Sequence, residues 1–300
     1  MSEFKRRRSL LLGCLGTVTA LVAIALILWP HHQEISQGLD QVSPSDFLVV
    51  CLLLLPSLLL RAEAWQIILH NARGALPRRS LYAAFACNLA VNNINAVAGL
   101  ATQIAVLRRL EPERAPSATQ LAAAALPMFW VEGSLAVLIL FISASTLDLS
   151  PLLLVGLGLG AFLGLWGMRF LEKRTQQRAA LQGLAIVSRP WELFKVGILM
   201  AFSFLFQLLR LAFALHAVGL SPDPFLVTAA FVGGGALGLL PIGAASAPAA
   251  LIAVYSTHDL ALAAVAGIVT AASVLLVSVL LALWFLPLLL KGGTFRKMNF

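Results

Sequence analysis

The sequence predicts an all-helical protein that crosses a lipid bilayer several times, and three observations support this fold class. Hydrophobic residues make up 60% of the 300 residues and charged residues only 11%, whereas about a quarter of the residues in a soluble domain are charged. The mean hydropathy is +0.92. The apolar residues gather in runs of about 20, the length that a helix needs to cross the hydrocarbon core of a membrane, and the basic residues lie mostly between these runs.

Six apolar runs are predicted to be transmembrane helices. The first follows the basic residues Lys5–Arg8, and we expect it to be retained as a signal anchor because no small-residue cleavage site follows it. The six predicted spans are Leu10–Trp29, Phe47–His70, Gln120–Ser145, Leu152–Phe170, Leu193–Gly219 and Leu260–Leu290.

Two further apolar stretches are interrupted, and each predicts a re-entrant hairpin that enters and leaves the membrane on the same side. Ser80–Leu107 contains four asparagines, and Phe225–Tyr255 contains a glycine triplet and two prolines. Broken backbone at membrane depth is tolerated only where protein buries it or a cavity hydrates it. The predicted fold is therefore six transmembrane helices plus two re-entrant hairpins.

The positions of Lys and Arg favour hairpins over complete crossings. With both hairpins returning and the N-terminus inside, the basic clusters around Arg78, Arg108 and Arg169–Lys195 are all cytoplasmic. The four outer connections then contain no Lys or Arg, as the positive-inside rule requires. We therefore expect a multi-pass protein of a bacterial inner membrane with both termini in the cytoplasm. The net charge of +8 follows from this topology and does not indicate a nucleic-acid partner.

The predicted helices form one transmembrane domain, residues 1–300, with two halves of opposite orientation. Half one covers about residues 10–145 with its hairpin at 80–107, and half two covers about residues 151–290 with its hairpin at 225–256. Each half crosses the membrane three times, so the two hairpins enter from opposite sides. A short match between Leu59–Ala62 and Leu208–Leu211, late in the second span of each half, supports the repeat. Inverted repeats with interrupted helices in matching positions are typical of transporters.

Three ionisable residues inside the predicted spans are candidates for function. Arg61, Glu132 and Arg210 lie at a depth where a charge costs about 2.5–3.5 kcal/mol and is normally paired or placed in a wet cavity. One interpretation is that Arg61 and Arg210 bind an anionic lipid headgroup. The alternative is that Glu132 neutralises one arginine and the other extends to its interface.

The carboxamides of the first hairpin are the other candidates. Asn88, Asn92 and Asn95 recur at helical spacing and share one face. They either cap the broken backbone of the hairpin or contact a polar headgroup. The complete set of candidate substrate-binding residues is Arg61, Asn92, Asn95, Gln103, Glu132 and Arg210.

No pattern in the sequence predicts an enzyme, a cofactor or a metal site. The three cysteines lie inside apolar runs without metal-binding spacing. The glycine run Gly233–Gly238 lacks the strand and the acidic residue of a dinucleotide-binding motif. Gly156, Gly160 and Gly164 form a ridge of small residues, which favours close helix packing either within the chain or in a homodimer.

The order of these features resembles the flippase-like transmembrane family, typified by the membrane region of lysylphosphatidylglycerol synthases. The run Leu59–Trp65, Leu-Leu-Arg-Ala-x-x-Trp, looks like the end of that family's second span. Asn92–Arg108 and Leu240–Leu251 occupy the places of its two hairpins, and the hopanoid-biosynthesis-associated branch is the most similar. The resemblance covers nearly the whole chain, from Arg6 to Leu290.

This chain departs from the family at both hairpins. Ala96 stands in place of the first hairpin's proline, and Thr102-Gln103 stands in place of its Gly-Glu pair. Pro248 stands in place of the second hairpin's glutamate, so both signature carboxylates are missing. The resemblance implies a transporter that moves the headgroup of an anionic or isoprenoid lipid through a groove between the hairpins. The alternative is a non-transporting scaffold for enzymes of envelope-lipid synthesis.

Overall fold

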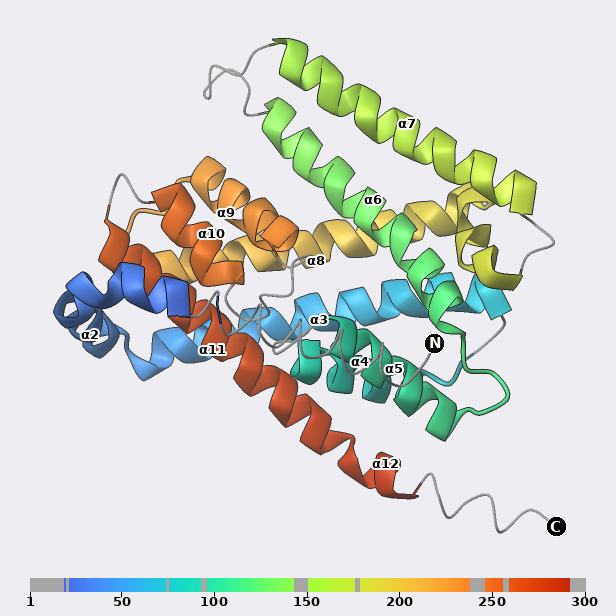
Figure 1. Cartoon of the computed structure of the whole chain (residues 1–300), viewed down its shortest axis with the longest axis horizontal. Helices are drawn as coiled ribbons and strands as arrows, with labels where there is room; N and C mark the ends of the chain where they lie inside the picture. The colour runs from blue at the N-terminus through green and yellow to red at the C-terminus, as the bar shows by residue number, and fades with distance from the viewer. Residues whose placement is uncertain are drawn as a thin grey trace. The chain divides into compact units, whose positions relative to one another are not determined.

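Helices account for all the regular structure in the part of the chain that the computed structural model describes, which is residues 19, 22–73, 76–92, 96–142, 151–175, 179–237, 246–255 and 259–291. The long helices are α3 (Pro44–Arg73), α6 (Ala118–Ile142), α7 (Pro151–Thr175), α8 (Pro190–Ala217) and α11 (Leu260–Trp284), shown in Figure 1. The shorter elements are η1 (Trp29–His31), α2 (His32–Gln41), α4 (Arg78–Asn92), α5 (Ala96–Leu110), η2 (Ala179–Ser188), α9 (Pro224–Leu237), α10 (Ser246–Tyr255) and α12 (Leu286–Lys291).

Four of these helices are long and apolar enough to cross a membrane. Their apolar parts are Pro44–His70, Ala118–Ile139, Pro190–Ala217 and Leu260–Trp284. A helix of 25 residues is about 37 Å long, against about 30 Å of hydrocarbon. Large apolar side chains on these helices are exposed. The lipid chains of a bilayer would remove these side chains from contact with water. The predicted all-helical, multi-pass class is therefore confirmed at this level.

The remaining two predicted spans have different outcomes. The span Leu152–Phe170 is helical throughout, within α7. Most of the span Leu10–Trp29 lies outside the described residues. Within its described part, residues 22–28 are α-helical. The count of six crossings therefore stays a prediction.

The helices form two compact units. Unit 1 comprises Met1–Leu55, Ala83–Val106 and Phe206–Phe300, and unit 2 comprises Pro56–Tyr82 and Leu107–Leu205. Most of both interrupted segments belongs to unit 1.

The first interrupted segment forms a helical hairpin. Its helices α4 and α5 have 15 residues each, so each is about 22 Å long and too short to cross the hydrocarbon. At the base, the Ser80 hydroxyl donates a hydrogen bond to Glu111, which follows α5, at 2.9 Å. Nearer the bend, Asn88 Nδ2 donates to Gln103 Oε1 at 2.8 Å. A Cβ on Gly99 would lie 2.5 Å from Asn88 Oδ1, so the two helices are in close contact.

The second interrupted segment also folds back on itself. Helices α9 and α10 lie side by side in Figure 1, and a Cβ on Gly233 would lie 3.6 Å from the Cβ of Ala250. Tyr255, the last residue of α10, is buried in the same apolar cluster as Val227 in the first turn of α9. The start and the end of this segment are therefore neighbours. Its predicted bend at Pro241 lies outside the described residues.

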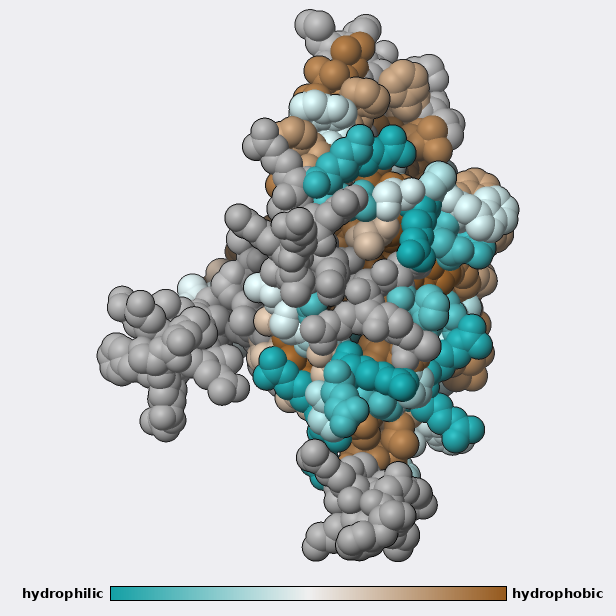
Figure 2. Space-filling view, turned by 90° about the vertical axis from the view of Figure 1, so that its right-hand side faces the viewer, coloured by the Kyte–Doolittle hydropathy of each residue, from teal (hydrophilic) through white to brown (hydrophobic). Residues whose placement is uncertain are grey.

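Basic side chains gather at one end of unit 2. Helices α5 and α7 end there and α6 and α8 begin there, on the right of Figure 1. Figure 2 views this end directly and shows hydrophilic side chains grouped on it. The exposed basic residues of these helix ends and connections are Arg78, Arg79, Arg108, Arg109, Arg114, Arg169, Lys173 and Arg189.

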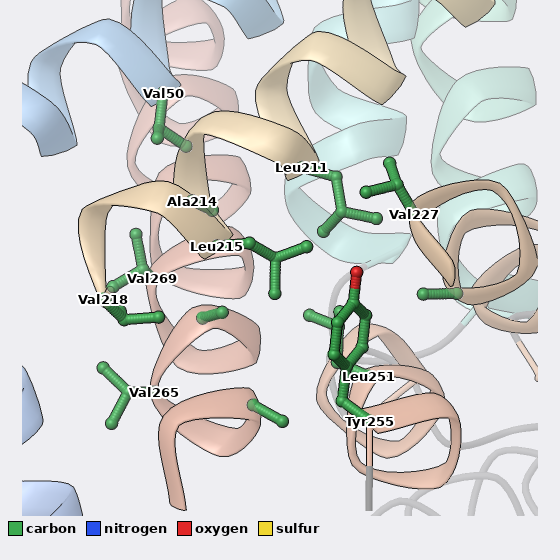
Figure 3. Close-up of a cluster of buried hydrophobic side chains, with 13 residues drawn as sticks. Val50, Leu211, Ala214, Leu215, Val218, Val227, Leu251, Tyr255, Val265 and Val269 are labelled. Carbon is green, nitrogen blue, oxygen red and sulfur yellow. The ribbon is translucent and has the colours of Figure 1, made fainter. Parts of the chain in front are cut away.

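An apolar core holds the second hairpin inside unit 1. Side chains from α3, α8, α9, α10 and α11 meet in it, and Figure 3 shows Tyr255 reaching toward Leu211 and Val227. Helices α10 and α11 are in direct contact, because a Cβ on Gly267 would lie 2.6 Å from the Cα of Pro248. The hairpin is therefore fixed by packing and has little room to shift against α11.

Candidate functional site

In unit 2 the structure pairs two of the candidate residues. Arg61 of α3 forms a salt bridge through its Nη2 with Oε1 of Glu132 on α6, and the two side chains are 31% and 20% exposed. Both residues lie inside candidate membrane spans. The carboxylate therefore neutralises Arg61, and an external anion would have to compete with it for this guanidinium.

Two residues after Arg61, Glu63 joins α3 to the start of α4. Its carboxylate accepts hydrogen bonds from the Tyr82 hydroxyl and, at 3.3 Å, from Arg78. Burial, with the hydrogen bond to Glu63 and the charge of Glu63, raises the pKa of Tyr82 to about 12. Tyr82 thus remains a donor at neutral pH, and this cluster has a structural role at the base of the first hairpin.

In unit 1, Arg210 is buried without a carboxylate. Arg210 is 7% exposed, so it is buried and does not extend to an interface with water. Its Nη1 donates to Ser273 Oγ of α11 at 3.4 Å. Among the described residues no acid pairs with it, and its Nε has no hydrogen-bond acceptor. Arg210 is therefore a cation with incomplete compensation inside a candidate membrane helix.

The carboxamide of Gln103 is also buried in unit 1 with one group unused. Gln103 is 0% exposed, and its Oε1 accepts the hydrogen bond from Asn88. Its Nε2 finds no acceptor in the described part of the chain. Asn92 is exposed at the end of α4, and Asn95 lies outside the described residues. Asn88, which the candidate set leaves out, is the asparagine that holds Gln103.

Two buried N–H donors of unit 1 have no acceptor in the described part of the chain, and they suit a ligand with acceptor oxygens. Arg210 Nε and Gln103 Nε2 are both N–H donors. Leaving a buried donor unsatisfied costs about 1–3 kcal/mol, and a ligand with acceptor oxygens would remove that cost. A phosphate or carboxylate has such oxygens and also neutralises the Arg210 charge. No group of three or more His, Cys, Asp or Glu residues that could hold a metal occurs in the searched, described ranges.

The glycine ridge of α7 is used in part within the chain. A Cβ on Gly164 would lie 3.2 Å from Cδ1 of Trp130 on α6, so this glycine permits close helix packing. Gly156 and Gly160 have no atom within 4 Å of such a Cβ among the described residues. No described residue therefore packs against these two glycines.

Comparisons with protein-family models, with curated proteins and with solved structures find no match to this chain. The resemblance to the flippase-like family therefore rests on the residues quoted above.

Proposed function

We propose that this protein binds and moves an anionic membrane lipid across the bilayer, as a transporter of the flippase type. The observation that carries the proposal is Arg210, a buried cation that has no carboxylate partner among the described residues of its unit. Charged residues inside membrane helices pair with one another or mark the path of a substrate. Arg210 does not pair with another charged residue of the described chain. It would therefore mark the path of a substrate by binding an anionic headgroup.

The chemistry of a second buried donor in unit 1, Gln103 Nε2, also fits an anionic headgroup. Arg210 Nε and Gln103 Nε2 are both donors, so the oxygens of such a headgroup would complete the hydrogen bonding of each donor that they reach. A hydrogen bond to a charged group contributes about 1.5–3 kcal/mol. A phospholipid or a polyisoprenyl phosphate carries the required oxygens. Asn92 and Asn95, near the bend of the first hairpin, are proposed as further contacts along the path.

The connectivity supports transport through the two hairpins. The first hairpin begins and ends at the basic end of unit 2, where α8 also begins. Helix α8 then leads away from that end, and the second hairpin follows it in the chain. If α8 crosses the membrane, the hairpins enter from opposite sides, as interrupted helices do in inverted-repeat transporters. The basic end would face the cytoplasm of a bacterial inner membrane.

The Arg61–Glu132 pair is proposed as a second contact on the path, in unit 2. An anionic headgroup there would replace Glu132 as the partner of Arg61. Because the pair is already neutral, this contact contributes less to affinity than Arg210 does.

Transport by reconstituted protein tests the proposal. Proteoliposomes would carry trace fluorescent phosphatidylglycerol, phosphatidylcholine or a polyisoprenyl phosphate, and a membrane-impermeant quencher would measure their movement between leaflets. Loss of one charged hydrogen bond, about 1.5–3 kcal/mol, corresponds to a roughly 10- to 150-fold reduction. We therefore expect Arg210→Gln to slow the movement of the anionic probes by at least about tenfold.

The matched control is Arg108→Gln, which removes an exposed cation from the end of α5 and should leave the rate unchanged. Arg210→Gln removes an incompletely compensated buried charge, so its unfolding temperature should equal or exceed that of the wild type. A stable Arg210→Gln variant with the wild-type rate would remove Arg210 from the path. A wild type that moves none of the three probes would reject transport.

The scaffold alternative has one observation in its favour. Helix α7 exposes the large side chains of Leu159, Phe162 and Trp166 beside the open glycines Gly156 and Gly160. A partner helix could pack against this face. Under this alternative, substitutions on α7 would disrupt complexes with enzymes of lipid synthesis, and Arg210→Gln would have no effect on lipid distribution.

A further inference from the structure

An apolar groove lies between α6 and α8 in unit 2, and none of its lining residues belongs to the proposed transport path. Its volume is about 530 Å³, within the range of about 300–1,000 Å³ that is usual for ligand sites. Helix α6 contributes side chains such as Trp130, Leu135 and Leu138, and α8 contributes Phe194 and Ile198. The lining extends along α8 from Pro190 to Ala201, about 16 Å at 1.5 Å per residue.

Two polar side chains break the apolar lining. Arg169, near the end of α7, is the one charged residue of the lining that is described, and it lines the groove together with Pro190 and Leu193 at the start of α8. It is exposed, and no carboxylate in the described part of the chain forms an ion pair with it. Ser134 on α6 also lines the groove, and its buried Oγ has no hydrogen-bond partner in the described ranges. The groove thus has an apolar length and a cationic end.

The position of the groove specifies its surroundings. Helices α6 and α8 are both candidate membrane spans, so an open groove between them faces lipid chains and not water. Its cationic end lies at the basic end of unit 2, where the helix ends meet the headgroup region of the proposed topology. An occupant needs an apolar chain along α6 and α8 and an anionic group at Arg169.

We infer that this groove binds one acyl chain of an anionic phospholipid, with the phosphate on Arg169. Arginine binds phosphate through two parallel N–H groups, which gives such a contact both strength and orientation. The uncompensated charge of Arg169 favours a lipid with net negative charge over a zwitterionic lipid of the same chain length. The site does not depend on the proposed transport, because none of its lining residues is among the path residues.

Photo-crosslinking in nanodiscs tests this site with two pairs of matched variants. The probes are phosphatidylglycerol and phosphatidylcholine that carry the same diazirine-labelled acyl chain, and mass spectrometry identifies the labelled peptides. Gly197→Phe places a ring in the groove, where a Cβ would meet no atom within 4 Å. Gly133→Phe adds the same ring to an exposed position on α6 that also meets no atom and does not line the groove.

With wild type we expect phosphatidylglycerol to label peptides of α6 and α8 several-fold more than phosphatidylcholine does. Gly197→Phe should reduce this labelling several-fold, and Gly133→Phe should leave it unchanged. Arg169→Gln should abolish the preference for phosphatidylglycerol, whereas Lys173→Gln, one turn further along α7, should retain it.

Three results would overturn the inference. The first is groove labelling that Gly197→Phe does not reduce. The second is equal labelling by both lipids in the wild type. The third is an unlabelled groove together with a wild-type dimer that Gly197→Phe dissociates, since a second copy would then occupy the groove. Crosslinking measures binding alone, so its failure and a failure of transport in proteoliposomes are distinguishable.

Discussion

Removing the Arg61–Glu132 salt bridge is expected to destabilise the protein by about 2 kcal/mol, and the structure sets this magnitude. Breaking a fully buried ion pair costs about 3–5 kcal/mol because one charge is left without compensation. Here the side chains are 31% and 20% exposed, which lowers the penalty toward the value for one charged hydrogen bond, about 1.5–3 kcal/mol. We therefore expect Arg61→Leu and Glu132→Leu each to lower the free energy of unfolding by about 2 kcal/mol.

The double variant separates the pair from its individual residues. Replacing both members of a buried pair by apolar side chains is often neutral or stabilising, so the double variant should be more stable than either single variant. Unfolding of the solubilised protein in a denaturing detergent, followed by tryptophan fluorescence, gives the four free energies of this double-mutant cycle. If the effects of the single substitutions simply add in the double variant, the two side chains do not interact and the pairing of α3 with α6 is wrong.

Transport by the same four proteins then distinguishes a structural pair from a contact on the lipid path. A double variant that folds and transports at the wild-type rate would restrict Arg61 and Glu132 to holding α3 against α6. A double variant that folds but has lost transport would keep them on the path.

Three further predictions concern the framework of the site. Gly267→Ala should lower the free energy of unfolding by about 1–3 kcal/mol, because the added Cβ would lie 2.6 Å from the Cα of Pro248; Gly133→Ala, where no atom is within 4 Å, should instead stabilise the helix by up to about 1 kcal/mol, and thermal unfolding compares the two. Asp259→Ala should lower the free energy of unfolding, measured by denaturant titration, by about 1 kcal/mol, because the Asp259 side chain caps the first turn of α11. A decrease no larger than that of a substitution at an exposed surface position would contradict the cap. Since the pKa of Tyr82 is raised from 10.0 to about 12, its hydrogen bond should contribute full stability below about pH 10 and lose it as the pH rises through about 12; a pH series of unfolding free energies should show a steeper alkaline decline for the wild type than for Tyr82→Phe.

The apolar helices could be predicted from the sequence because hydropathy is a local property. Phe47–His70 is predicted and Pro44–Arg73 is observed, while Leu193–Gly219 is predicted and Pro190–Ala217 is observed. The observed helices begin about one turn earlier, at Pro44 and Pro190, because proline is favoured at the first helical position and hydropathy does not register it. The interruptions of the two hairpin segments could also be predicted from the sequence, because groups of glycine, proline and asparagine break a helix.

Features that depend on tertiary packing could not be predicted in this way. The 3-10 helix η2 packs against α6 and α7 and buries Leu184, Ile186 and Val187, although the charge pattern assigns this stretch to a connection between spans. The apolar run of η2 is too short to predict a transmembrane helix. Its sequence pattern does not indicate which helices it contacts. For the same reason the sequence does not show which arginine Glu132 neutralises. A salt bridge between residues 71 positions apart depends on how the helices are placed side by side.

Arg61 and Arg210 occupy matching contexts in the sequence but have different electrostatic environments in the structure, and this difference favours Arg210 as the anion-binding residue. Arg61 is neutralised by Glu132, whereas Arg210 has a distant hydroxyl at 3.4 Å and an unsatisfied Nε. The environment of Arg210 does not favour folding, since an uncompensated buried charge lowers the stability of the protein. Departures from optimal packing and polar satisfaction concentrate at functional sites. An anion that completes the environment of Arg210 would therefore stabilise the folded protein by mass action, whereas it would gain little by displacing Glu132 from Arg61.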